Sequence, residues 1–219
     1  MRQFGLWLVK QSRGRGPCVT KGPLMTSNVT VRALAAHDAA CVSRIWVQGL
    51  DQSKLAVAWV FRRWFMRKMN GMRDAALANT GDVGPNGCNL ITTYDGKPDR
   101  RMFVACMGPA QTVVGCCAVK IGMDETKAQD DSDTCSIWRM SVDATARGRG
   151  VATKLVTACE DWSRAAGRHK MGLYTINPVA ADFYVKRMGY HTTDHFHPVN
   201  NRVAKWIVPP VYKYEKSLS

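Results

Sequence analysis

The stretch ARGRGVATKL, residues 146–155, has the residue types and spacing best suited to chemistry in this chain. It precedes an amphipathic helical pattern that begins at Val151. The first turn of a helix has free backbone N–H groups and the positive end of the helix dipole. Gly148 and Gly150 carry no Cβ, so an anion can approach the main chain closely. Polar and basic side chains surround the two glycines: Arg147, Arg149, Thr153 and Lys154. The stretch therefore predicts a cradle for a pyrophosphate group.

Several kinds of phosphate-binding turn could account for these glycines. A P-loop requires G-x-x-x-x-G-K-S/T, which is absent. A dinucleotide-binding turn requires a third Gly or Ala where this chain has Thr153, and a strand directly before it. A glycine-rich loop entering an ordinary helix is the third interpretation. The tetrapeptide RGRG also occurs at residues 13–16, where Pro17 follows and no helical pattern begins. The turn by itself favours this third interpretation.

A longer pattern surrounds the turn between Trp138 and Tyr190, in the segments WRMSVDATARGRGVATKL and TINPVAADFYVKRMGY. Residues 147–152 match the motif R/Q-x-x-G-x-G/A, and an Asn follows the next strand, before an Ala…Tyr…Gly-aromatic helix. In these features the chain resembles the GNAT superfamily of acyl-CoA-dependent N-acyltransferases, over roughly residues 29–216. The resemblance implies a single-domain α/β fold with a mixed, largely antiparallel sheet flanked by helices. It also implies acetyl-CoA as the co-substrate.

The resemblance implies a role for each matched position. The main chain of Met140, Ser141 and Val142 would pair with the pantetheine arm as an extra strand does. Asn177 would contact the pantetheine region, and Tyr184 would lie near the acyl thioester sulfur. Seven consecutive residues would hold the pyrophosphate: Arg147, Gly148, Arg149, Gly150, Val151, Ala152 and Thr153.

Tyr184 is the candidate general acid. An amine attacks the thioester carbonyl and a CoA thiolate departs. A thiol pKa of about 8.5 and a tyrosine pKa of about 10 make a phenol a reasonable proton donor to that sulfur. Packing of an aromatic helix face is the alternative interpretation. Four residues separate Tyr184 from Gly189, one more than in the commonest family pattern. Either the helix ends with an extra residue, or Phe183, which cannot donate a proton, takes the expected place.

No carboxylate stands out as the general base that a charged acceptor amine requires. The chain has three glutamates, Glu125, Glu160 and Glu215. Glu125 belongs to an acidic loop, residues 122–133, at the strand end opposite the glycine turn. This loop is typical of a solvated run of charge, with Asp133 as its one candidate base. We therefore expect either a chain of water molecules to remove the proton or an acceptor that is not strongly basic.

No metal site is predicted. His191, His195 and His197 have no zinc-ligand spacing and lie where a strand follows the last helix, either at the edge of the acceptor site or in solvent. In the GNAT superfamily, the connection between the first two helices often lines the acceptor groove. Asp51 and Gln52 are therefore possible acceptor contacts.

The elements that must position these residues follow the order β-α-α-β-β-β-α-β-α-β-β. Strands are predicted over residues 29–34, 100–107, 112–121, 135–142, 170–176, 190–196 and 211–216. Helices are predicted over residues 39–50, 55–78, 151–166 and 177–188, with glycines ending the last two. The pattern predicts one domain over residues 28–219.

Composition limits the partners and the compartment. The net charge of +14 favours anionic partners such as phosphates, nucleic acid or an acidic membrane surface. Eight scattered cysteines without a C-x-x-C spacing indicate reduced, mostly buried thiols in a reducing intracellular compartment. No apolar run reaches the ~20 residues that span a bilayer. A basic amphipathic helix at residues 55–69 is expected to pack on its own domain, with membrane-surface contact as the alternative.

Residues 1–27 form a basic extension, since the first acidic residue of the chain is Asp38. An Arg-rich, acid-poor start is typical of an organelle transit peptide. A disordered tail fits equally, as does an upstream extension, because Met25 begins a credible domain. We accordingly expect a cytoplasmic location, or an organellar one if residues 1–27 are a transit peptide.

The predicted function is an acetyl-CoA-dependent N-acetyltransferase that works by direct transfer in a ternary complex. Its acceptor is a protein N-terminus, a lysine or a small amine, and the positive net charge disfavours polycationic acceptors. Two alternatives remain: a non-catalytic acyl-CoA-binding regulatory module, and a basic nucleic-acid-binding protein, for which no recognition motif is present.

Overall fold

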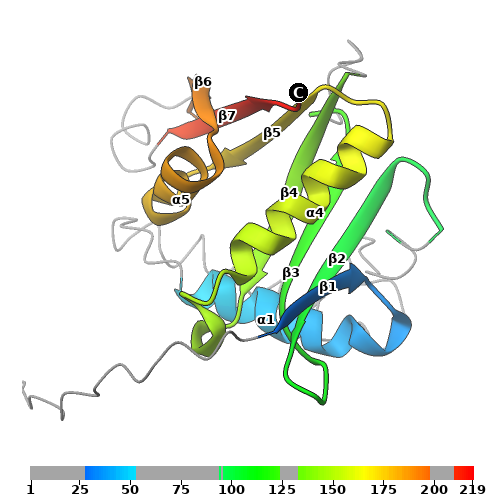
Figure 1. Ribbon diagram of the computed structural model, residues 1–219. Helices are drawn as coiled ribbons and strands as arrows, with labels where there is room; N and C mark the ends of the chain where they lie inside the picture. The colour runs from blue at the N-terminus through cyan, green and yellow to red at the C-terminus, as the bar shows by residue number, and fades with distance from the viewer. Residues whose placement is uncertain (1–27, 53–93, 95, 124–132, 198–209) are drawn as a thin grey trace, which may run out of the picture.

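The computed structural model describes residues 28–52, 94, 96–123, 133–197 and 210–219 (Figure 1). Seven strands form one sheet in the order β1-β2-β3-β4-β5-β7-β6. Their bounds are β1 Val29–Ala33, β2 Arg100–Met107, β3 Thr112–Ile121, β4 Thr134–Val142, β5 Lys170–Thr175, β6 His191–Phe196 and β7 Val211–Ser217. Neighbouring strands are antiparallel except β4 and β5, which are parallel. The predicted mixed, largely antiparallel sheet is confirmed.

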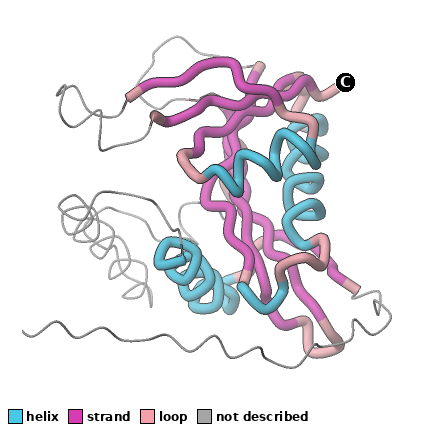
Figure 2. Tube along the Cα trace, turned by 90° about the vertical axis from the view of Figure 1, so that its left-hand side faces the viewer, coloured by secondary structure: helices cyan, strands magenta, loops and turns pink. Residues whose placement is uncertain are grey.

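In the described part of the chain, three helices flank the sheet: α1 Ala39–Gln52, α4 Val151–Ala165 and α5 Pro178–Met188. Figure 2 shows α1 on one side of the sheet and α4 on the other. The predicted strands and these three helices are all present, and their order along the chain agrees with the prediction. The second predicted helix, residues 55–78, and the basic extension, residues 1–27, lie outside the described residues. None of the described helices is long and apolar enough to cross a membrane.

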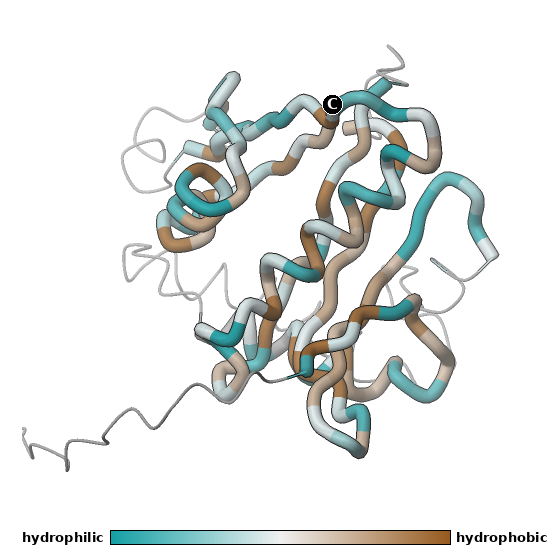
Figure 3. Tube along the Cα trace, in the orientation of Figure 1, coloured by the Kyte–Doolittle hydropathy of each residue, from teal (hydrophilic) through white to brown (hydrophobic). Residues whose placement is uncertain are grey.

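Two clusters of buried side chains fill the two faces of the sheet, because successive residues of a strand point to opposite sides. In β3, Cys117 and Val119 pack in the cluster that contains α4 and α5, whereas Cys116 and Ala118 pack in the cluster that contains α1. Hydrophobic residues therefore concentrate on the central strands and on the helix faces against them (Figure 3). The six described cysteines are free thiols, and five of them are buried, as the sequence predicts.

Asp38 ends a short 3-10 turn, residues Ala36–Asp38, that leads into α1. Its carboxylate accepts hydrogen bonds from the Arg32 guanidinium and from the Ala35 N–H. Burial alone would raise the pKa of Asp38, but these hydrogen bonds outweigh burial and the pKa is lowered. The ion pair thus ties the start of α1 to β1.

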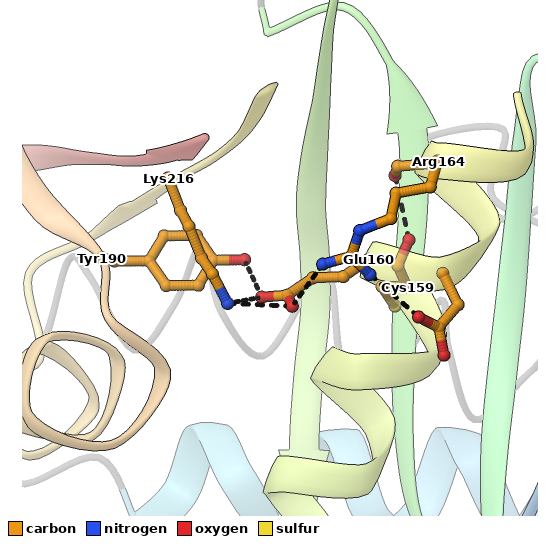
Figure 4. A network of polar contacts seen from close by, with 7 residues as sticks. Cys159, Glu160, Arg164, Tyr190 and Lys216 are labelled. Carbon is orange, nitrogen blue, oxygen red and sulfur yellow. Dashed lines mark hydrogen bonds and ion pairs between the residues drawn. The ribbon is translucent and has the colours of Figure 1, made fainter. Parts of the chain in front are cut away.

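A buried carboxylate joins α4 to the C-terminal strand (Figure 4). Glu160 is 3% exposed, and both of its oxygens lie 2.9 Å from Lys216 Nζ on β7. Tyr190, directly after α5, donates its hydroxyl hydrogen to Glu160 Oε1 at 3.1 Å. Arg164, one turn further along α4, lies 3.8 Å from Glu160 Oε2. The network holds α4, β7 and the end of α5 in one arrangement.

We expect Glu160→Gln to lower the free energy of unfolding by about 1–2 kcal/mol, because the substitution keeps the volume but removes charge-assisted hydrogen bonds. Urea unfolding of both proteins at pH 7 measures the difference. Acetyl-CoA affinity should stay within about twofold of the wild-type value, since Glu160 lies more than two turns from the start of α4 at Val151. An unchanged unfolding free energy would show that the network adds nothing to stability.

Candidate active site

Strands β4 and β5 begin side by side and then diverge (Figure 1). They pair only through Thr134↔Lys170, Cys135↔Met171 and Ser136↔Gly172. Beyond these pairs β4 continues to Val142 and β5 continues to Thr175 without pairing to each other. We call the diverging parts, residues 137–142 and 173–175, the β4–β5 fork. Because the two strands are parallel, the fork opens at the carboxyl ends of both.

A β-bulge lies inside the fork. The β3 partners shift between Cys116, which pairs with Ser141, and Ala118, which pairs with Trp138, so Arg139 and Met140 together face Cys117. Arg139 has a φ of 50°, which is uncommon for a residue other than glycine. Bulges of this kind often lie next to active sites, where they redirect the chain.

Met140, Ser141 and Val142, the predicted pantetheine contacts, form the β4 side of the fork. Ser141 and Val142 pair with β3 on one edge, so the opposite edge of their main chain faces the fork. The Ser141 hydroxyl donates to the Ile45 carbonyl of α1 at 3.0 Å. A Cβ at Gly49 would overlap this hydroxyl, so α1 packs closely on β4 here. The main chain, rather than the Ser141 side chain, is therefore the group available to a ligand.

The glycine turn joins β4 to α4. Asp143 begins it by accepting hydrogen bonds from the Thr145 N–H at 2.8 Å and the Thr145 hydroxyl at 2.6 Å, and these bonds lower the pKa of Asp143. Arg147 Nε donates to the Val142 carbonyl at 3.3 Å. Gly148 and Gly150 both have a φ of 76°, a left-handed conformation that a side chain would strain. The backbone conformation thus favours glycine at both positions, although nothing lies within 4 Å of where a Cβ would be.

The first turn of α4 has no side-chain cap. Gly150 occupies the N-cap position, where Ser, Thr, Asp or Asn would ordinarily accept a backbone hydrogen bond. The first helical bond runs from the Lys154 N–H to the Gly150 carbonyl at 3.1 Å, so the preceding N–H groups have no acceptor within the helix. Four exposed residues surround this end: Arg147, Gly148, Arg149 and Gly150. The predicted cradle thus has the geometry of an anion site, while the binding of a pyrophosphate stays a prediction.

Lys154 is positioned differently from its neighbours. Its Nζ donates to the Val29 carbonyl of β1 at 2.7 Å, so its charge lies on the β1 side of the helix. The start of α4 is fixed by Gly115 of β3, where a Cβ would lie only 3.0 Å from Val151 and 3.1 Å from Leu155. This close approach brings the first turn of α4 against the end of β4.

Asn177 follows β5, at the carboxyl end of the fork. Its side-chain oxygen accepts the Val179 N–H at 3.0 Å and so caps α5. This bond leaves the amide nitrogen as the donor that could reach a ligand. The predicted contact with the pantetheine region stays a prediction.

The end of α5 shows how the extra residue before Gly189 is accommodated. The Gly189 and Tyr190 N–H groups both donate to the Tyr184 carbonyl, five and six residues back, where a regular turn would reach four. The last turn is therefore wide, and the extra residue lies after Tyr184. This is the first of the two alternatives from the sequence, and Tyr184 rather than Phe183 occupies the buried position.

Tyr184 is 4% exposed and packs edge-on between Phe183 and Tyr190, with ring centroids 5.2 and 5.5 Å away. Burial raises the pKa of Tyr184 well above its usual value, and the nearby thiols of Cys117 and Cys159 raise it further. The phenol is therefore neutral throughout the physiological range. The same shift makes the proton harder to release, so donation requires a strong acceptor such as a departing thiolate.

The carboxylates from the sequence do not gather at the fork. Glu160 belongs to the buried network described above. Asp133 lies just before β4, at the end away from the fork, and accepts the His169 N–H at 3.2 Å. Glu125 lies outside the described residues. Among the residues that the structure describes, we find no carboxylate positioned as a general base.

The histidines form no metal centre in the described part of the chain, where no group of His, Cys, Asp and Glu could hold an ion. His191 and His195 are exposed on the edge strand β6, and the His195 ring stacks on Tyr212 at 5.8 Å. Asp51 and Gln52 end α1, and their side chains lie outside the described residues.

Two features of the site were missed from the sequence. The bulge at Arg139 has no local signal, because arginine does not favour a positive φ. Two exposed aromatic residues, Trp138 on β4 and Tyr174 on β5, also border the fork. The sequence does contain a signal for them. Because side chains alternate between the two faces of a strand, both lie on the same face as Ser136 and Gly172.

Comparison with known proteins supplies the family. The sequence matches the acetyltransferase (GNAT) family over residues 70–190, more than half of the chain. The chain therefore belongs to this family, and acyl transfer is the class of reaction that membership supports. No curated protein sequence matches the chain.

Solved structures share the fold. The PaiA N-acetyltransferase of Thermoplasma acidophilum, in complex with coenzyme A, is 14% identical with a TM-score of 0.57, over 86% of this chain and 98% of that one. A GCN5-related N-acetyltransferase of Kribbella flavida is 16% identical with a TM-score of 0.57, over 86% and 97%. YncA of Salmonella typhimurium, with its cofactor acetyl-CoA, is 14% identical with a TM-score of 0.54, over 87% and 94%. At these identities the likeness shows the fold alone.

Proposed function

We propose that this protein is an N-acetyltransferase that transfers an acetyl group from acetyl-CoA to an amine within a ternary complex. The observation that carries the proposal is the meeting of two features at one edge of the sheet. The β4–β5 fork opens at the carboxyl ends of its strands, and the uncapped first turn of α4 follows β4 directly. A ligand with a pyrophosphate and an extended amide-bearing arm matches both, because the helix start binds the anion and the strand edge binds the amides.

Each part of acetyl-CoA then has a place. The pyrophosphate lies on the N–H groups at the start of α4, beside Arg147 and Arg149. The pantetheine amides pair with the main chain of residues 140–142, and the Asn177 amide contacts the arm from the β5 side. The thioester lies within the fork. The amine nitrogen attacks its carbonyl carbon, the C–S bond breaks, and Tyr184 supplies a proton to the CoA sulfur.

Direct transfer requires no acyl-enzyme intermediate, and three of the described cysteines are poorly suited to form one. A thiol acts as a nucleophile in its thiolate form. Burial raises the pKa of Cys116 to about 12, and burial also raises the pKa of Cys106 and Cys135. These thiols are protonated near neutral pH and lie in the core.

A non-catalytic acyl-CoA-binding module is the second candidate, favoured by the high pKa of Tyr184 and by the lack of a carboxylate base among the described residues. Thiol release separates the two. The full chain is mixed with acetyl-CoA and single amines, and the product is identified by mass spectrometry. We expect one thiol released per N-acetylated amine, and no comparable release without amine. Tight acetyl-CoA binding without turnover of any amine would favour the module.

A further inference from the structure

Trp138 and Tyr174 occupy equivalent positions on the two sides of the β4–β5 fork. The last pair before the fork is Ser136↔Gly172. Trp138 lies two residues after Ser136, and Tyr174 lies two residues after Gly172. Because side chains alternate along a strand, both aromatic residues point to the same face as that last pair.

This face is the one opposite α4. Trp138 pairs with Ala118, which packs in the cluster that contains α1. Tyr174 follows Leu173, which packs in the cluster that contains α4, so the Tyr174 side chain points the other way. The cradle at the start of α4 and the two aromatic rings therefore lie at opposite mouths of the fork. A thioester held between them would be reached by its acceptor from the aromatic side.

The Trp138 ring is held firmly in place. Its Nε1 donates to Ser136 Oγ at 2.7 Å, and Ser136 Oγ donates in turn to the Gly122 carbonyl at 2.6 Å. Lys120 Nζ lies 4.4 Å from the indole centroid. Trp138 is nevertheless 40% exposed as a residue. An oriented, exposed indole presents a surface for stacking that costs little conformational entropy on binding.

The Tyr174 ring is also oriented by a neighbour. It meets Phe196 of β6 edge-on, with centroids 5.8 Å apart and an angle of 80° between the planes. Tyr174 is 36% exposed and Phe196 is 49% exposed. The face of the fork opposite α4 thus carries exposed aromatic rings from three strands.

We propose that these rings select the acceptor: a small primary amine that carries an aromatic ring and no second positive charge. This inference rests on the proposed acetyltransferase function. The substrate ring stacks between Trp138 and Tyr174, and a short linker places the amine in the fork. A cation already lies over the indole in the form of Lys120, so the remaining ring surface favours an aromatic group over a second cation. The net charge of +14 acts in the same direction against polyamines.

The reaction with such an acceptor requires no group beyond those already named. The amine nitrogen forms a bond to the acetyl carbon as the C–S bond breaks. The nitrogen loses one proton to water, and the CoA thiolate gains one proton. The products are the N-acetylated aromatic amine and free CoA.

Steady-state kinetics of the full chain test the proposal with phenethylamine, n-hexylamine and spermidine. We expect kcat/KM for phenethylamine to exceed that for n-hexylamine by about 3- to 10-fold, the size of an aromatic pair contact, and to exceed that for spermidine further. Trp138→Ala should remove this preference, mainly through KM, and Trp138→Phe should restore most of it. Tyr174→Ala is a second, independent variant. Val185→Ala, an exposed change on α5, is the matched control and should leave the preference intact.

Acetyl-CoA binding, measured by thermal shift on each variant, distinguishes failure of the acceptor proposal from failure of the proposed acetyltransferase function. If acetyl-CoA stabilises the protein but n-hexylamine or spermidine is used as well as phenethylamine or better, the acceptor proposal is wrong and the acetyltransferase function stands. If acetyl-CoA does not bind the wild-type protein, the proposed function itself is wrong. A preference that survives in both Trp138→Ala and Tyr174→Ala would also overturn the acceptor proposal.

Discussion

Tyr184→Phe is expected to lower kcat by about 100- to 1000-fold while acetyl-CoA affinity stays within about twofold, the range typical of a lost general acid. The ring and its contacts with Phe183 and Tyr190 remain, so packing is preserved. Only the proton for the departing thiolate is lost. Pre-steady-state measurement of thiol release, together with calorimetric titration of acetyl-CoA, gives both quantities.

The pH profile adds a second readout. Because burial raises the pKa of Tyr184, its proton stays bound well above pH 10, and the wild-type kcat should show no falling limb from this group in the alkaline assay range. Tyr190→Phe is the matched control, since it removes another buried tyrosine hydroxyl, one that contacts Glu160. The control should lose stability and keep its turnover. Equal loss of turnover in both variants would assign Tyr184 to packing and the proton to water.

Gly150→Val is expected to weaken acetyl-CoA binding by roughly 10- to 100-fold. A left-handed φ costs an L-residue about 1–2 kcal/mol, and Gly150 has a φ of 76° at the position where the helix N–H groups point outward. The valine side chain would also limit the approach of a phosphate. Arg149→Glu should have an effect of similar size, through charge reversal beside the same N–H groups. Calorimetric titration of acetyl-CoA measures both.

Gly167→Val is the matched control for backbone strain. Gly167 has a φ of 71° and, like Gly150, nothing lies close to where its Cβ would be. Gly167 follows the C-terminal end of α4, whereas the cradle lies at the N-terminal end of the same helix. The control should show a similar loss of stability and an unchanged acetyl-CoA affinity. Unchanged affinity in both Gly150→Val and Arg149→Glu would remove the cradle from the binding site.

The elements of the fold could be predicted from the sequence because local signals agree with the tertiary arrangement. The runs RRMFVACM and TVVGCCAVKI became β2 and β3 with the predicted bounds. The helix stops were also readable, since Gly167 and Gly189 adopt the left-handed conformation that ends α4 and α5. Where the positions of glycine and proline and the alternation of hydrophobic residues predict the same element, tertiary contacts do not change it.

The shape of the site could not be predicted in the same way, because it depends on contacts between distant residues. The fork exists because β4 and β5 stop pairing after Ser136, and the register of two parallel strands has no local code. Lys154 has the spacing of a cradle residue, but the carbonyl of Val29, distant in sequence, draws its ammonium toward β1. The sequence therefore predicts the cradle motif, whereas the aromatic face opposite it required the structure.

The proposed reaction depends on acetyl-CoA binding, which a thermal-shift comparison of acetyl-CoA, ATP and NAD measures. A ligand that binds the native state raises the free energy of unfolding, and with it the unfolding temperature, by an amount that grows with the logarithm of the ligand concentration over Kd. At 100 times Kd the gain is about 2.7 kcal/mol. ATP and NAD share phosphate groups with acetyl-CoA but lack the pantetheine arm that the β4–β5 fork would bind. We predict a clear rise with acetyl-CoA, a much smaller rise with ATP and NAD, and loss of the acetyl-CoA effect in Gly150→Val. An equal shift with all three ligands, or none with acetyl-CoA, would show that the cradle and the β4–β5 fork do not form an acetyl-CoA site.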